Sequence, residues 1–368
     1  MDQFNHNSQA SLLPPCDLYL PPSQRKSLMF SSVQEADWVQ AAEGCGKATW
    51  VSALTSPEHR EYLREAYPEL GLPEKLTIKQ VIGNPAGGAL VSGETLCALA
   101  RHGDPSFIWR VVVLSAIDAL PKHFDVNHRR MSLHDWRGLA QWAKDNPEDC
   151  SLGFEHAAQR LEGEGALVRL LCHGIERDLL SERDLLSARE VSAFSLVKGL
   201  MMLSRDLRYM DAIRLKVYVE PKTLEDWRVT GFVDASKMLY SRAYLAWRRE
   251  DLCALYFHRL ANTPYQIGQA FRDMAQGLGF VLRDLPSGAR LLPRDLQIDA
   301  AQQALLFNRF FPLVADVGKS KSFNAYRHLF GQMEKTSKHL SPRGFTEALS
   351  YVVGSGAAWR KTWRKEPE

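Results

Sequence analysis

Polar side chains that could contact nucleic acid gather on one face of a predicted helix. After Thr263 and Pro264, apolar residues recur with the spacing of a helical face, at Ile267, Ala270, Phe271 and Met274. The opposite face carries Gln266, Gln269 and Arg272. Glutamine and arginine can reach the edges of bases from a helix in a DNA groove. These three residues are therefore candidates for contacts with bases.

A short hairpin is predicted directly after this helix. Gly277 and Gly279 end the helix, and the segments Phe280–Asp284 and Ala289–Leu292 are the expected strands. Basic residues on or just after the hairpin are placed for phosphate contacts, and they are Arg283, Arg290 and Arg294. A helix followed by a two-stranded wing resembles a winged helix-turn-helix module. That resemblance implies nucleic-acid binding by about sixty residues of the chain.

Positive charge is concentrated at the end of the chain. The net charge is +3, but residues 317–368 hold ten Lys and Arg against four Glu, which is +6 and leaves −3 for the rest. The basic residues assigned to phosphate contact in this segment are Lys319, Lys321, Arg327, Lys335, Lys338, Arg360, Lys361 and Arg364. A basic end on a mildly acidic body favours a nucleic-acid partner, and we expect DNA rather than RNA. A solvated helical face is the alternative.

The residues Glu220-Pro221-Lys222 indicate an alternative function. They follow an alternating segment that is typical of a strand. The spacing matches the E-x-K half of a PD-(D/E)xK nuclease core. There the glutamate and an upstream aspartate, here Asp211, would share a Mg²⁺, and Lys222 would hold the attacking water. A metal-dependent nuclease is thus the alternative function, and a helical protein–protein scaffold is a third.

Other motifs predict neither a cofactor nor a metal. Gly44–Lys47 reads GCGK, but Ala41 and Ala48 replace the glycine and hydroxyl residue of a phosphate-binding loop, and we expect no apolar strand before it. The six cysteines include no CxxC pair, so a zinc finger or ribbon is excluded. Scattered thiols and the absence of a signal sequence favour the cytoplasm. The longest apolar run, Phe107–Leu120, is too short to span a membrane.

The expected fold is mainly α-helical, an α+β protein with small antiparallel sheet elements. Helix starts are predicted at Ser56-Pro57, at Ser132 with Asp135, and at Ser341-Pro342. Alternation over 213–219 predicts a half-buried strand, with Arg228–Val233 as its antiparallel partner. Lys237–Leu260 is expected to be one helix.

Five segments follow from these signals. They are a flexible N-terminal arm at 1–32, a helical domain at 33–150, a helical domain ending in a strand at 151–220, an α+β module with the winged-helix-like segment at 221–316, and a basic helical segment at 317–368. The preferred function is non-catalytic nucleic-acid binding, alone or as a subunit of a nucleoprotein complex with protein partners.

Overall fold

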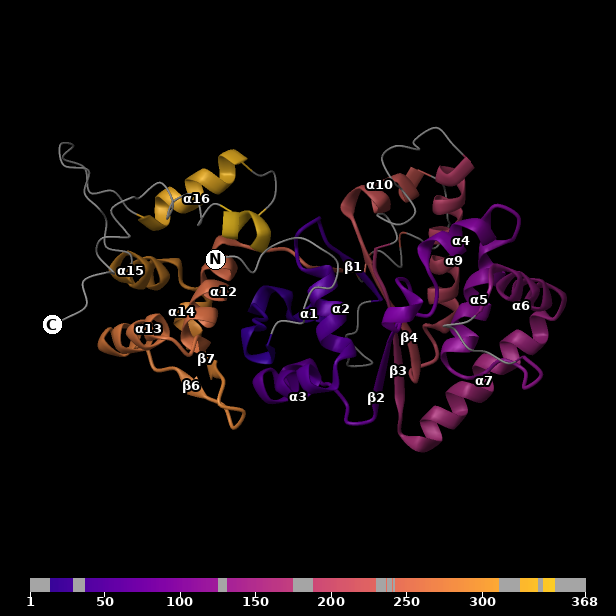
Figure 1. The fold of residues 1–368 in the computed structure, drawn as a ribbon, viewed down its shortest axis with the longest axis horizontal. Coiled ribbons are helices and arrows are strands. Elements are labelled where there is room, and N and C mark those ends of the chain that lie inside the picture. Colours follow the sequence, from indigo (N-terminus) through magenta and orange to yellow (C-terminus); the bar gives the residue numbers. More distant parts are fainter. Residues whose placement is uncertain are drawn as a thin grey trace.

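Strands that are far apart in the sequence meet in one sheet (Figure 1). They are β1 (Trp38–Gln40), β2 (Leu76–Gln80), β3 (Leu167–Cys172), β4 (Ile213–Val219) and β5 (Ala243–Tyr244). Their order across the sheet is β2-β3-β4-β1-β5, and the pairings β2–β3, β3–β4, β4–β1 and β1–β5 are all parallel. Parallel neighbours require crossover connections, which the helices between the strands provide.

The computed structural model describes residues 14–28, 37–124, 131–174, 188–229, 236, 240, 242–310, 325–336 and 340–347. No helix in these ranges is long and apolar enough to pass through a lipid bilayer.

Helices cover both faces of the sheet (Figure 1). One face packs against α4 (Gly93–Ala100), α5 (Pro105–Ala116), α6 (Leu133–Asp145), α7 (Pro147–Glu164) and α9 (Ala188–Leu207). The other face packs against α2 (Lys47–Thr55) and α3 (Pro57–Ala66), together with α1 (Arg25–Leu28). Shorter elements complete this part, namely η1 (Pro15–Asp17), η2 (Pro22–Gln24), η3 (Pro68–Leu70), η4 (Pro85–Gly87) and α10 (Pro221–Val229).

The prediction of small antiparallel sheet elements was therefore wrong for the main sheet. The strand at 213–219 is confirmed, but its partners are β3 and β1, both parallel. The predicted partner Arg228–Val233 begins inside helix α10, and its last residues lie outside the described ranges. The helix expected over Lys237–Leu260 also differs, because β5 lies within that range and α12 begins at Arg249.

Both faces of β4 are buried, which explains why its alternation was misread. Ile213, Leu215 and Val217 face the cluster of α5 and α9, while the polar side chains between them face the other layer. The guanidinium of Arg214 pairs with Asp211 at 2.6 Å, and Lys216 Nζ donates to the carbonyl of Ser27 at 3.2 Å. Buried charges persist where such partners exist. The polar residues of this alternating pattern therefore lie on a buried face, where Arg214 has an ion-pair partner and Lys216 has a hydrogen-bond partner.

The local capping signals are confirmed. The side chain of Ser56 accepts from the N–H of His59 at the start of α3, and Pro57 is the first helical residue. Ser132 and Asp135 form the reciprocal capping box that opens α6. Ser341 Oγ accepts from the N–H of Gly344 at 3.1 Å. These bonds satisfy first-turn amides that have no partner within the helix.

The N-terminal arm was expected to be loose, but residues 14–28 pack on the body. Leu20 and Leu28 are fully buried, and the amide of Gln24 donates to the carbonyl of Ala246 at 2.8 Å. Leu18 and Tyr19 bury their side chains against the same layer. The apolar residues of this segment thus offset its ordering entropy.

A helical C-terminal lobe follows the sheet. It comprises α12 (Arg249–Asn262), α13 (Gln266–Gly277), the antiparallel pair β6 (Arg283–Asp284) and β7 (Arg290–Leu291), α14 (Arg294–Ile298), α15 (Ala300–Phe310), α16 (Ala325–Thr336) and a final helical turn at 342–347. Helix α12 is its centre, and Phe257 within α12 is completely buried. The hydrophobic cluster of the lobe continues into α2 and α3, so the lobe and the sheet share one core.

Candidate functional site

The loop between β1 and α2 lies at the carboxyl edge of the sheet. β1 and β4 are neighbours, yet the chain leaves β1 toward α2 and leaves β4 toward α10, on opposite sides of the sheet (Figure 1). In open parallel sheets, the crevice at such a switch point is where ligands bind. The loop at 41–46 and Glu220, the residue after β4, occupy this place.

Two glycines give this loop its shape. Gly44 and Gly46 have φ values of 77° and 95°, a left-handed conformation that residues with a Cβ adopt at a cost. Gly46 is the N-cap of α2, and a Cβ at Gly44 would lie 3.4 Å from Ser341 Oγ. The sequence GCGK therefore does follow a strand and open a helix, contrary to our expectation. The strand was missed because it has only three residues.

Lys47 is the first residue of α2, and its side chain turns back along the loop. Its Nζ donates to the carbonyl of Ala41 at 3.0 Å and lies 3.2 Å from Glu220 Oε1. The side chain of Lys47 is 14% exposed and that of Glu220 is 34% exposed, so solvent reaches the pair from one side. Ala48 and Thr49, which follow Lys47, are exposed. The amino end of α2 is thus open to a ligand, with a cation beside it.

Residues of the C-terminal lobe and just before it contact this loop. The indole of Trp247 donates to the carbonyl of Cys45 at 2.9 Å. Arg343, at the start of the final helical turn, places its Nη1 3.5 Å from Oε1 of Glu43 in the loop. A ligand at the loop would therefore sit between the sheet and residues 341–343.

The residues that would hold Mg²⁺ in a phosphate-binding loop do not fit that ion here. Ala48 stands where a hydroxyl residue would bind the metal, and the end of β3 carries Cys172 rather than a carboxylate. Burial raises the pKa of the Cys172 thiol, so it stays protonated. Among the described residues there is no group of three His, Cys, Asp or Glu side chains that could share an ion.

The predicted nuclease residues lie apart. Asp211 precedes β4 and pairs with Arg214, while Glu220 follows the strand and pairs with Lys47. β4 runs roughly 20 Å between them. Lys222 is exposed on α10. One Mg²⁺ cannot contact both carboxylates at this separation, because its oxygen ligands lie at about 2.1 Å.

The helix predicted after Pro264 is confirmed as α13, which begins at Gln266, and its contact with bases stays a prediction. Gln266 and Gln269 are exposed, as a contact surface requires. Gln269 is held by its own helix, since its amide donates to Asp273 at 2.6 Å. Arg272 is engaged within the protein, because its Nη1 donates to the carbonyls of Ala261 and Thr263 at 3.0 and 3.1 Å. It thereby satisfies the end of α12.

The predicted hairpin is also confirmed, but it packs on the body instead of projecting as a free wing. The N–H of Ser287 at its turn donates to Glu65 on α3 at 3.0 Å. Arg283 Nη2 donates to the carbonyl of Ala66 at 3.4 Å, and Arg290 pairs with Asp284 at 3.1 Å. Two of the three predicted phosphate contacts are thus engaged within the protein. Arg294, at the start of α14, is exposed.

The remaining basic residues are only partly described. Arg327 is exposed on α16, and Lys335 lies in the same helix, where the placement of its side chain is not described. The rest of the predicted set lies outside the described residues, namely Lys319, Lys321, Lys338, Arg360, Lys361 and Arg364. Whether these cations form one surface therefore stays a prediction.

Comparisons with known proteins give no family. No protein-family model matches the chain, and no curated protein matches it. A solved structure of the Aeropyrum pernix ORC2 protein, in ADPNP–ADP complexes, aligns with a TM-score of 0.30 and 13% identity over 94% of this chain and 98% of that chain. A similarity this low carries no argument about function.

Proposed function

We propose that the loop at 41–46, with Lys47, binds the phosphates of a nucleoside polyphosphate. The observation that carries the proposal is the position of GCGK between a parallel strand and the amino end of α2, with Lys47 Nζ at the sheet edge. Left-handed glycines let backbone N–H groups approach an anion, and the helix end favours negative charge. The strand order β2-β3-β4-β1-β5 places β1, and the loop that follows it, between β4 and β5 in the parallel sheet.

The bound nucleotide would be held without metal-assisted hydrolysis. Ala48 supplies no hydroxyl, and Cys172 to Gly174, the described residues at the carboxyl end of β3, supply no carboxylate, so among the described residues the donor set that places Mg²⁺ on the phosphates is incomplete. Lys47 would exchange Glu220 for a phosphate when the nucleotide binds. Binding would then serve to fix the C-terminal lobe, through Ser341 and Arg343, against the loop.

Titration of the full chain with a fluorescent ATP analogue tests this proposal. Lys47→Ala should lower the affinity about tenfold or more, because a charge-assisted contact is lost. Lys198→Ala, which removes an exposed lysine from α9, is the matched control and should bind like the wild type. Equal affinity in the two variants, or no binding by the wild type, would remove the proposal.

A second proposal is non-catalytic binding of nucleic acid, DNA rather than RNA, by the C-terminal lobe. It is favoured by the exposed glutamines of α13, by the exposed Arg294, and by the +6 charge of residues 317–368. In this proposal the chain acts alone or as a subunit of a nucleoprotein complex. The nuclease alternative lacks this support, because its carboxylates lie at opposite ends of β4.

Binding to a labelled duplex over a range of salt concentrations tests the second proposal. Each phosphate contact releases counterions, so the affinity should fall steeply as salt rises. Arg294→Gln should reduce the slope of log affinity against log salt concentration by about 1, the contribution of one phosphate contact. Arg283→Gln should leave the slope unchanged, because Arg283 faces the body of the protein. A flat salt dependence of the wild type, or no binding at low salt, would contradict this function.

A further inference from the structure

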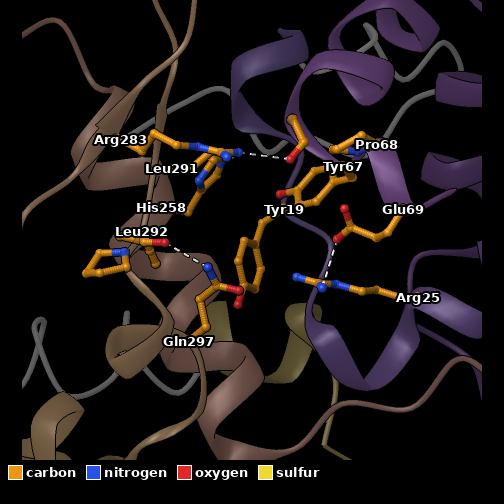
Figure 2. A pocket seen from close by; sticks show the side chains of 12 residues that line it. Tyr19, Arg25, Tyr67, Pro68, Glu69, His258, Arg283, Leu291, Leu292 and Gln297 are labelled. Carbon is orange, nitrogen blue, oxygen red and sulfur yellow. Dashed lines mark hydrogen bonds and ion pairs between the residues drawn. The ribbon is translucent and has the colours of Figure 1, made fainter.

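A cavity lies between the C-terminal lobe and the amino-terminal elements, away from the β1–α2 loop (Figure 2). Its volume is about 330 Å³, and none of the residues that line it belongs to the loop at 41–46. Three stretches of chain form its walls: Tyr19 and Arg25; residues 66–69; and the lobe from His258 to Gln297. This volume lies at the lower end of the range for small-molecule sites.

The charge of the cavity is positive. Arg25 pairs with Glu69 at 2.8 Å on one wall, and Arg283 approaches from the opposite wall (Figure 2). The nearest partner of Arg283 is a neutral one, the carbonyl of Ala66 at 3.4 Å. His258 adds no charge near neutral pH, since burial lowers its pKa to about 4. The described lining therefore holds two guanidinium groups against one carboxylate.

Two of the residues that line this cavity also carry a buried polar atom without a hydrogen-bond partner among the described residues. The hydroxyl of Tyr19 and the Nε of Arg25 have no hydrogen-bond partner within the described ranges. Tyr19 as a residue is only 4% exposed. Unsatisfied buried polar groups are rare in folded proteins and indicate a missing water, ion or ligand. The Nε of Arg25 can only donate and the hydroxyl of Tyr19 can donate, so a ligand with acceptor atoms would suit both groups.

We propose that this cavity binds a small organic anion. Its carboxylate or phosphate group faces Arg283 and Arg25, where guanidinium forks match the geometry of either group. Its apolar part, a ring or short chain, lies against Tyr67, Leu292 and the ring of Tyr19. The ligand bridges elements of the sheet and of the C-terminal lobe. It therefore holds the two parts together from the side opposite to residues 341–343.

Saturation-transfer NMR on the full chain tests the site, with benzoate and phenyl phosphate as anionic probes and benzyl alcohol as the neutral one. Saturable binding of either anion is expected, and the stronger of the two identifies the natural head group. Arg283→Gln should weaken that binding about tenfold. Arg309→Gln removes an exposed arginine of α15 that does not line the cavity, and it should bind like the wild type.

Tyr19→Phe gives a second test that does not depend on the arginines. Its hydroxyl has no acceptor in the described protein, so the thermal midpoint should stay level or rise, while anion binding weakens. The inference is overturned if neither anion binds, if benzyl alcohol binds as well as they do, or if Arg283→Gln and Tyr19→Phe both bind like the wild type. Nucleotide binding to the β1–α2 loop is measured with a different probe and is unaffected by this outcome.

Discussion

At the scale of single residues, the contact between Lys47 and Glu220 is the main feature of the candidate phosphate site. The ammonium is 3.2 Å from the carboxylate and donates to the carbonyl of Ala41 as well. A phosphate would compete with Glu220 for this cation and would also be repelled by its negative charge. Glu220 is therefore expected to weaken nucleotide binding.

Glu220→Gln should tighten binding of the ATP analogue roughly fivefold, the modest size expected for a partly exposed ion pair. The measurement is the same fluorescence titration as for Lys47→Ala. Glu225→Gln, on the exposed side of α10, is the control. If Glu220→Gln binds more weakly than this control, then Glu220 supports the ligand instead of competing with it.

At the scale of elements, the junction between α12 and α13 depends on a close approach of two backbones. A Cβ at Gly268 would meet the carbonyl oxygens of Thr263 and Leu260 and the side chain of Arg272. Arg272 in turn donates to the carbonyls of Ala261 and Thr263. The orientation of α13 is thus fixed by the buried Gly268 and by the half-buried Arg272.

Gly268→Ala should lower the free energy of unfolding by about 2 kcal/mol or more, because the added methyl group overpacks the junction. Gly277→Ala, at the other end of α13, meets no atom within 4 Å and should be close to neutral. Urea denaturation of both variants checks this. A loss in Gly268→Ala no larger than in Gly277→Ala would show that the junction relaxes.

Helix α12 also carries a titratable group into the contact between the lobe and the sheet. His258 is completely buried, its Nε2 is 3.5 Å from the Tyr62 hydroxyl of α3, and its ring lies 5.5 Å from that of Tyr19. Burial disfavours the charged imidazolium, which lowers the pKa of His258 from 6.5 to about 4. At the scale of the whole molecule, this contact should therefore be sensitive to acid.

The free energy of unfolding should fall as the pH drops from about 6.5 toward 4, because the unfolded chain binds the proton first. This contribution is fully present above the pKa of the unfolded state, and its loss is at most about 3 kcal/mol. Denaturation midpoints of the wild type and of His258→Gln at several pH values measure it. A pH slope over this range that is the same in both proteins would contradict the assignment.

The sequence by itself determined the local elements of this protein. Helix starts at Ser56 and Ser132, the strand at 213–219, helix α13 and the following hairpin were all predictable, because capping, periodicity and turn residues act over a few neighbouring positions. The exposure of Gln266 and Gln269 followed from the same periodicity.

Only the tertiary structure decided which elements meet. Strands of two or three residues, β5 and β1, have no periodic signal, so the parallel sheet could not be read from the sequence. The neighbour of GCGK is Glu220, which is 173 positions away in the chain. Arg283, which was predicted to contact a phosphate, donates to the carbonyl of Ala66 and lines a cavity, because the hairpin docks on the body of the protein. Long-range packing sets these partners, and local patterns do not encode it.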